Sequence, residues 1–185
     1  MLTVDVDDLD EHFPASTSER KQRLARIRQR LVDISDGVQS LSQQLYSPHL
    51  DFIGLAAAMR RFCRDFAQSQ KVDIQFEADK IDRTPAPDVS LCLLRVLQEA
   101  LHNAAKHSQV RRFAVRLACS TNELDLQVSD RGAGFDLESA LKSGGIGLSS
   151  MLERVGLING TISIDSEPLR GTTIRVRAPL TVAAS

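Results

Sequence analysis

The fold is decided by three stretches of sequence: QEALHNAAKH at 98–107, VSDRGAGF at 128–135 and SGGIGLSSM at 143–151. The first ends an amphipathic helix that we expect to begin with Asp88 as its N-cap and to reach about Lys106. The second leads out of an alternating strand, and the third leads from glycines into another helix. The polar residues of these motifs are therefore expected at a helix face, at a strand end and at a helix start.

On the first helix, Glu99, Asn103 and Lys106 lie at i, i+4 and i+7, within an arc of roughly 60°. An asparagine offers a neutral oxygen to Mg²⁺, a lysine offers a positive charge to phosphate, and a glutamate accepts a proton. The stripe therefore suits a metal–phosphate site. Taken alone, however, such a stripe is more often a solvated helix face.

In the second motif, Asp130 stands at the end of a strand, where its carboxylate could accept a hydrogen bond from an amino group such as that of adenine. Gly132 and Gly134 would let the backbone turn tightly beside a flat ring. The alternative is a plain glycine turn. A single Asp-x-Gly-x-Gly pattern does not decide between the two.

In the third motif, the glycines at 144, 145 and 147 precede a helix whose N-terminal N–H groups and dipole suit an anion. The alternative is a flexible loop followed by a helix. The later stretch RGTT at 170–173 could offer a hydroxyl to the same ligand, although it is also an ordinary hairpin turn.

The surrounding pattern predicts short strands and helices that form an α+β sandwich. We expect a mixed sheet with helices on one face, because neighbouring strands have short links. On the helix that ends in the first motif, the expected core face is Leu94, Leu97, Leu101 and Ala104. The other expected elements are helices over 55–70 and 148–158, strands over 72–78, 113–118, 124–128, 161–165 and 173–177, and a mostly looped segment over 130–147.

The N-terminal third has a different pattern. Residues 1–18 are acidic and then rich in small polar residues, which is typical of a disordered tail. Over 19–46, apolar residues recur at alternating spacings of three and four, from Leu24 to Leu45. We interpret 19–50 as a helix that forms a homodimer and 51–185 as a separate domain that carries the three motifs. A helix that docks on its own domain is the alternative.

Composition limits the possible partners. The chain has 185 residues and a net charge of −1, so nothing favours direct binding to nucleic acid. Its three cysteines are isolated in sequence and indicate a reducing compartment. No apolar run approaches the roughly 20 residues of a membrane span. We therefore expect a cytoplasmic domain without a membrane segment, whether or not a longer parent is attached to a membrane.

Together, the Glu–Asn–Lys helix, DRGAGF, GGIGL and RGTT resemble the ordered motifs of the ATPase superfamily of gyrase, Hsp90, histidine kinases and MutL. Within it, residues 31–180 resemble sensor histidine kinases whose partners are LuxR- or NarL-type response regulators. QEALHNAAKHS is similar to their N box, and the two glycine motifs are similar to their G1 and G2 boxes. This resemblance implies a Bergerat-type α/β sandwich that binds ATP and Mg²⁺.

The resemblance also implies roles at the matching positions. Glu99 would be the catalytic acid–base residue, and Asn103 would hold Mg²⁺ and contact the nucleotide. Asp130 would bind the adenine amino group, and residues 136–143 would form a short lid over ATP. The other nucleotide contacts would come from Lys106, His107, Gly132, Gly134, Gly145, Ile146, Gly147, Leu148 and Thr172.

One element of the family pattern is missing, namely the helix that carries the phosphorylated histidine. None of His12, His49, His102 and His107 stands in a suitable helical pattern. We interpret the chain as a fragment of a histidine kinase. The alternatives are action on a histidine in another protein, a serine kinase of the anti-sigma-factor type, or a nucleotide-sensing dimerisation module without transferase activity.

Overall fold

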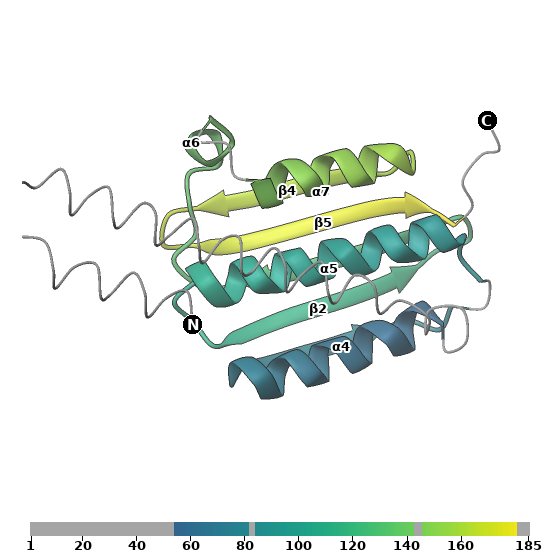
Figure 1. The fold of residues 1–185 in the computed structure, drawn as a ribbon, viewed down its shortest axis with the longest axis horizontal. Helices are drawn as coiled ribbons and strands as arrows, with labels where there is room; N and C mark the ends of the chain where they lie inside the picture. The colour runs from purple at the N-terminus through teal and green to yellow at the C-terminus, as the bar shows by residue number, and fades with distance from the viewer. Residues whose placement is uncertain (1–53, 82–83, 143–145, 181–185) are drawn as a thin grey trace, which may run out of the picture. The chain divides into compact units, whose positions relative to one another are not determined.

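The computed structural model describes residues 54–81, 84–142 and 146–180 (Figure 1). The tail expected at 1–18 and the dimerisation helix expected at 19–50 lie outside these residues. The described elements are α4 (Leu55–Gln70), β1 (Asp73–Ala78), α5 (Pro87–His107), β2 (Arg112–Cys119), β3 (Glu123–Asp130), α6 (Leu137–Lys142), α7 (Ile146–Leu157), β4 (Thr161–Glu167) and β5 (Gly171–Pro179).

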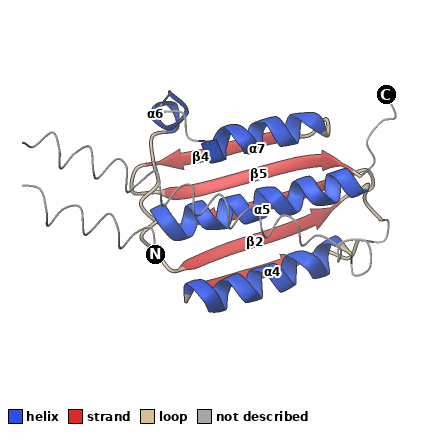
Figure 2. Ribbon diagram, viewed as in Figure 1, coloured by secondary structure: helices blue, strands red, loops and turns tan. Residues whose placement is uncertain are grey.

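The strands form one five-stranded sheet in the order β1-β2-β3-β5-β4. The β1–β2 pair is parallel and the other three pairs are antiparallel, so the sheet is mixed. Helices α4, α5 and α7 cover the same face of this sheet (Figure 2). The predicted α+β fold, a mixed sheet with helices on one face, is confirmed.

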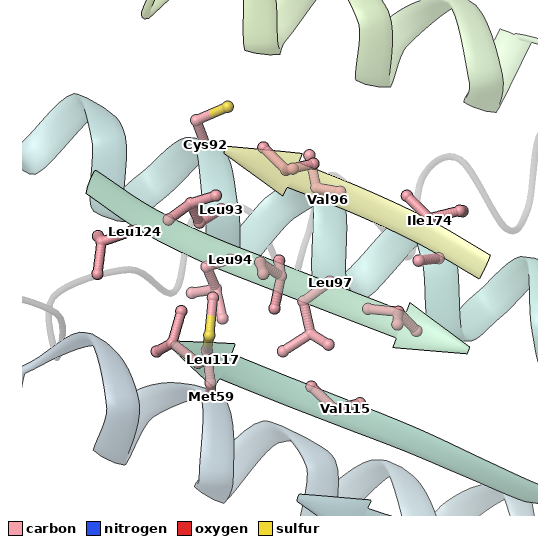
Figure 3. Close-up of a cluster of buried hydrophobic side chains, with 14 of the residues drawn as sticks. Met59, Cys92, Leu93, Leu94, Val96, Leu97, Val115, Leu117, Leu124 and Ile174 are labelled. Atoms are coloured by element: carbon pink, nitrogen blue, oxygen red, sulfur yellow. The ribbon is translucent and has the colours of Figure 1, made fainter. Parts of the chain in front are cut away.

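The core lies between that helical layer and the sheet. Alternate residues of β2, Phe113, Val115 and Leu117, are each at most 1% exposed. They face the apolar side of α5, where Leu93 and Leu97 are fully buried (Figure 3). Burying each such side chain contributes roughly 1.5–3 kcal/mol, so this alternation aligns the sheet with α5. The predicted core face of α5 is confirmed, since Leu94, Leu97, Leu101 and Ala104 are all buried.

Three local predictions were wrong. Helix α5 has Ala86 as its N-cap and Pro87 in its first turn, whereas Asp88 lies inside that turn. A proline fits the first helical position because its missing N–H would have no intrahelical partner there, and Asp88 still favours the positive end of the helix dipole. The segment expected to be mostly loop contains α6, and α7 begins at Ile146 rather than at residue 148.

The opposite face of the sheet is polar. At its centre the Asp125 carboxylate accepts two hydrogen bonds from Arg175, at 2.9 and 3.0 Å, and one from Arg177 at 3.3 Å. Partial burial raises the pKa of Asp125, but its bonds to the two guanidinium groups outweigh burial and bring the net pKa below the usual value. On this face of the sheet, β3 and β5 are therefore joined by polar side-chain contacts. No helix in the described part of the chain is long and apolar enough to cross a membrane.

Candidate nucleotide-binding site

The chemistry-bearing segments meet at one end of the sheet (Figure 1). The C-terminus of α5, the turn between β4 and β5, and the start of α7 all lie there. The end of β3 lies there too, because Asp130 pairs with Thr172 at the start of β5. These segments come from four separate parts of the sequence. The antiparallel register of β3, β5 and β4 brings the strand ends together, and α5 crosses the same sheet face with its last turn at this end.

On α5, Glu99 and Asn103 form a pair. The Asn103 side-chain amide donates a hydrogen bond from Nδ2 to Glu99 Oε1 at 3.1 Å, and both residues are partly buried. The spacing of four residues places them on neighbouring turns of the helix. Because Nδ2 is turned toward the carboxylate, Oδ1 is the amide atom that can serve a cation or another donor.

The start of α7 lies directly against this pair. A Cβ built on Gly147 would overlap Glu99 Oε1 and would stand 3.0 Å from Glu99 Cδ and 3.4 Å from Asn103 Nδ2. The absence of a Cβ at Gly147 lets the start of α7 approach the Glu99 carboxylate this closely. The structure thus brings Glu99, Asn103 and Gly147 together.

The loop after β3 is attached to the end of α5. The backbone N–H of Ala133 donates to the carbonyl of Ser108 at 2.7 Å. A Cβ on Gly132 would overlap that carbonyl and would stand 2.7 Å from the Ser108 Cβ. Since Ser108 follows directly after the helix, the 130–135 loop is held one turn beyond the stripe of Glu99 and Asn103.

At the start of this loop, the Asp130 carboxylate accepts a hydrogen bond from the backbone N–H of Gly132 at 2.8 Å. Burial raises the pKa of Asp130, although backbone hydrogen bonds from Gly132 and Thr172 oppose the rise. An aspartate held by backbone donors has a fixed orientation, and its remaining lone pairs can accept from an amino group.

The turn between β4 and β5 packs on the same loop. Gly134 has φ of +57°, and a Cβ there would overlap the carbonyl of Glu167. The backbone N–H of Leu169 donates to the carbonyl of Ala133 at 2.6 Å. Leu169 itself has φ of +66° and is 89% exposed, at a turn position that usually takes glycine or asparagine. Glycine at 134 and an unfavourable leucine at 169 therefore mark a close contact between two loops.

The structure places the remaining predicted site residues as follows. Lys106 and His107 are exposed in the last turn of α5, where positive charge also favours the helix dipole. Leu148 is partly buried and packs against the core, so contact with phosphate would fall to its backbone. Gly145 and the side chain of Ile146 lie outside the described residues. His102 packs edge-on against Phe66, with ring centroids 5.0 Å apart.

Sequence reasoning missed two residues of this region. Ser108 supplies the carbonyl on which the 130–135 loop is anchored. Ser166 accepts a hydrogen bond from the backbone N–H of Phe135 at 3.0 Å and lies 3.0 Å from Thr172 Oγ1. The signal for Ser166 was its place in a strand, on the face of Ile162 and Ile164, where an apolar residue would be expected.

The residues present fit a metal that is bound mainly by a ligand's phosphates. Asn103 can offer Oδ1, a neutral oxygen of the kind that Mg²⁺ accepts. No group of three or more histidine, cysteine, aspartate or glutamate side chains gathers within the described ranges to hold a metal. Mg²⁺ commonly takes one or two protein oxygens together with phosphate and water oxygens. The single amide oxygen of Asn103 is therefore enough as the protein's ligand to such an ion.

Residues 88–182 match the family of histidine kinase-, DNA gyrase B-, and HSP90-like ATPases. The chain belongs to this ATPase family. The matched region runs from the first turn of α5 past the end of β5, and it therefore contains every residue of the site described above. Membership implies that this domain binds ATP.

The relatives of this ATPase family member include histidine kinases. The chain is 35% identical over 163 residues to the oxygen sensor histidine kinase NreB of Staphylococcus carnosus, which covers 88% of this chain. The chain spans about half of that relative, 46% of its length. The solved histidine kinase domain of the blue-light activated kinase of Erythrobacter litoralis has a TM-score of 0.62 at 20% identity, over 86% of this chain and 84% of the other. The solved catalytic domain of histidine kinase ThkA has a TM-score of 0.54 at 17% identity, over 69% of this chain and 90% of the other.

Proposed function

We propose that this chain is the ATP-binding catalytic region of a two-component sensor histidine kinase, which transfers the γ-phosphoryl group of ATP to a histidine. The observation that carries the proposal is the contact of Gly147 with Glu99 and Asn103. It joins a proton acceptor, an amide oxygen and the N-terminus of a helix at one point, which is what a phosphoryl-transfer site requires. The 35% identity to a sensor histidine kinase supports the same assignment.

In the proposed site, ATP lies with its adenine at the 130–135 loop and its phosphates at the start of α7. The Asp130 carboxylate accepts a hydrogen bond from the adenine amino group, and Gly132, Gly134 and Thr172 lie around the ring. Backbone N–H groups of Ile146, Gly147 and Leu148, at the start of α7, face the phosphates, and Gly145 is the further phosphate contact that the sequence predicts. Lys106 and His107, in the last turn of α5, contribute on the phosphate side. Residues 136–143, which include α6, form the lid over the nucleotide.

The chemical step is an in-line displacement. An imidazole nitrogen forms a bond to the γ-phosphorus, while the bond from that phosphorus to the β–γ bridging oxygen breaks and ADP leaves with the electron pair. The Glu99 carboxylate orients the imidazole and accepts its N–H proton. The hydrogen bond from Asn103 holds Glu99 in place before the nucleotide binds. Lys106 offsets negative charge on the transferred group.

Asn103 would hold Mg²⁺ through Oδ1. When bound, this ion neutralises charge on the phosphate oxygens. The amide orientation described above leaves Oδ1 for this purpose.

We further propose the setting in which this site works. The helix predicted at 19–46 would form the homodimer, and the phosphoryl group would pass to an aspartate of a response regulator with LuxR- or NarL-type output. Cytoplasmic ATP and the free thiols of the three cysteines are consistent with a cytoplasmic location. We expect no direct contact with nucleic acid.

The test is titration of the full chain with a fluorescent ATP analogue, with and without Mg²⁺, followed by phosphotransfer to a histidine-bearing helix bundle supplied in trans. Wild-type protein should bind the analogue more tightly with Mg²⁺, and Asn103→Asp should abolish use of Mg·ATP while leaving the circular dichroism spectrum unchanged. Normal phosphotransfer by that variant would show that the metal assignment is wrong.

Gln98→Glu is the matched control, because it makes the same amide-to-carboxylate change on the same helix at a residue outside the stripe of Glu99, Asn103 and Lys106. It should behave like wild type. Acid stability of the product separates histidine from serine phosphorylation, since phosphohistidine is acid-labile. A wild-type chain that ignores millimolar adenine nucleotide would overturn the proposal as a whole, and sedimentation of the same samples tests the dimer.

A further inference from the structure

Three polar residues form one row across the end of the sheet. Asp130 of β3 is the register partner of Thr172 of β5, and Thr172 lies opposite Ser166 of β4. The next row inward is Val128, Ile174 and Ile164, all on the helix-covered side. Because strand side chains alternate between faces, the three polar side chains lie on the same side as the core. They therefore form the polar edge of the core at the site.

Ser166 connects the two ends of the 130–135 loop. Its Oγ accepts the backbone N–H of Phe135, at the far end of the loop, at 3.0 Å. The same Oγ lies 3.0 Å from Thr172 Oγ1, and the Thr172 backbone bonds to Asp130, at the near end. One hydroxyl thus ties both ends of the loop to a single cross-strand pair.

From this network we propose that Ser166 is a positioning residue for purine recognition, which sets whether the Thr172 hydroxyl acts as a hydrogen-bond donor. The proposal rests on the proposed nucleotide site and adds to it the determinant of the base that is accepted. Ser166 does not itself touch the purine in this arrangement. It acts through Thr172 and through the backbone at Phe135.

Counting protons gives the reason. A serine hydroxyl has one proton, and one lone pair of Ser166 is already used by Phe135 N–H. The proton has two acceptors within reach, the Gly171 carbonyl at 3.2 Å and Thr172 Oγ1 at 3.0 Å. If it goes to Gly171, Thr172 must give its own proton to Ser166. If it goes to Thr172, the Thr172 proton can be donated outward to a ligand.

The second state matches adenine. On the edge of adenine, the amino group is a donor and the adjacent N1 is an acceptor. Asp130 can only accept, so it suits the amino group, and a Thr172 hydroxyl that donates suits N1. Guanine carries the reverse pattern, with an oxygen at position 6 and a protonated N1. A site whose buried polar groups are left unpaired by the wrong base discriminates strongly against it.

The experiment pairs one substitution with one change in the ligand. Affinities of the full chain for ATP, GTP and 1-deaza-ATP, which lacks the N1 acceptor, are measured by competition with a fluorescent analogue. Wild type should bind 1-deaza-ATP about tenfold more weakly than ATP, the effect of one hydrogen bond. Ser166→Ala removes the contact that holds the Thr172 hydroxyl in place, so the roughly tenfold difference between ATP and 1-deaza-ATP should shrink and the preference for ATP over GTP should fall in part.

The controls isolate the hydroxyl. Ser163→Ala makes the same change on the exposed face of β4 and should keep the wild-type ratios. Ser166→Thr keeps a hydroxyl at this position and should keep the wild-type affinity ratios. If Ser166→Ala does not fold, Ser166→Cys takes its place, because it nearly keeps the side-chain volume, and it should lose the wild-type ratios. If Ser166→Ala, or Ser166→Cys in its place, weakened ATP and 1-deaza-ATP by the same factor, the role would be structural only, and the proposal would be overturned. Wild type that binds no nucleotide refutes the proposed function instead.

Discussion

Replacing Gly147 by alanine should separate the activity of this protein from its stability. The new Cβ would overlap Glu99 Oε1 and stand 3.0 Å from Glu99 Cδ. Ordinary van der Waals contact needs about 3.5 Å or more, so the carboxylate has to withdraw by about 1 Å or more. It can do so, because it is the flexible end of a partly buried side chain.

The expected magnitudes follow from that movement. Alanine is a better helix former than glycine by at most about 1 kcal/mol, which offsets the cost of moving Glu99, and the free energy of unfolding should stay within about 1 kcal/mol of wild type. Phosphotransfer should fall by roughly 100-fold, since a misplacement of about 1 Å at a reacting group costs that much. The hydrogen bond from Asn103 to Glu99 should be lost as well.

The assay compares urea unfolding with the rate of phosphotransfer to a supplied histidine bundle. Gly156→Ala is the matched control in the same helix, because a Cβ there meets nothing within 4 Å. It should raise stability by up to about 1 kcal/mol and leave the rate unchanged. A wild-type rate for Gly147→Ala would refute the placement of Glu99 at the reacting group, and unfolding of that variant would show that rigid neighbours, not the carboxylate, fill the space.

Three further predictions concern the same domain. Burial holds the pKa of Asp130 above its unfolded value of about 3.9, so the stability of wild type relative to Asp130→Asn should fall as pH rises from about 4 through the raised pKa. Urea unfolding of both proteins from about pH 4 to 7 checks this. A stability difference between wild type and the variant that rose with pH would contradict it. That variant should also lose ATP binding. Burial raises the pKa of Cys63 to about 12 and of Cys92 to about 11, so Cys119 should react first with iodoacetamide, and equal labelling of all three by mass spectrometry would refute this order. Leu169→Gly should raise the free energy of unfolding by about 0.5–1 kcal/mol, since it relieves φ of +66° at an exposed position; a loss in thermal unfolding would indicate a contact of the leucine side chain instead.

The amino-acid sequence by itself determined the elements whose pattern is periodic. Helix α4 matches its predicted bounds of 55–70, and the alternation in 113–118 and 124–128 identified β2 and β3, because side-chain burial repeats every two residues in a strand and about every 3.6 in a helix. The order of the motifs identified the family. These features are local, so neighbouring residues suffice to predict them.

Only the tertiary structure decided how the site is held together. The contact of Gly147 with Glu99 joins residues far apart in the sequence, and the bond of Ser166 to Phe135 joins β4 to a loop that precedes it by about 30 positions. Neither leaves a pattern in its own segment, because the partner is brought there by strand order and by packing of α5 on the sheet. Isolated, Ser166 is an ordinary strand serine, and it becomes part of the site through the register of three strands.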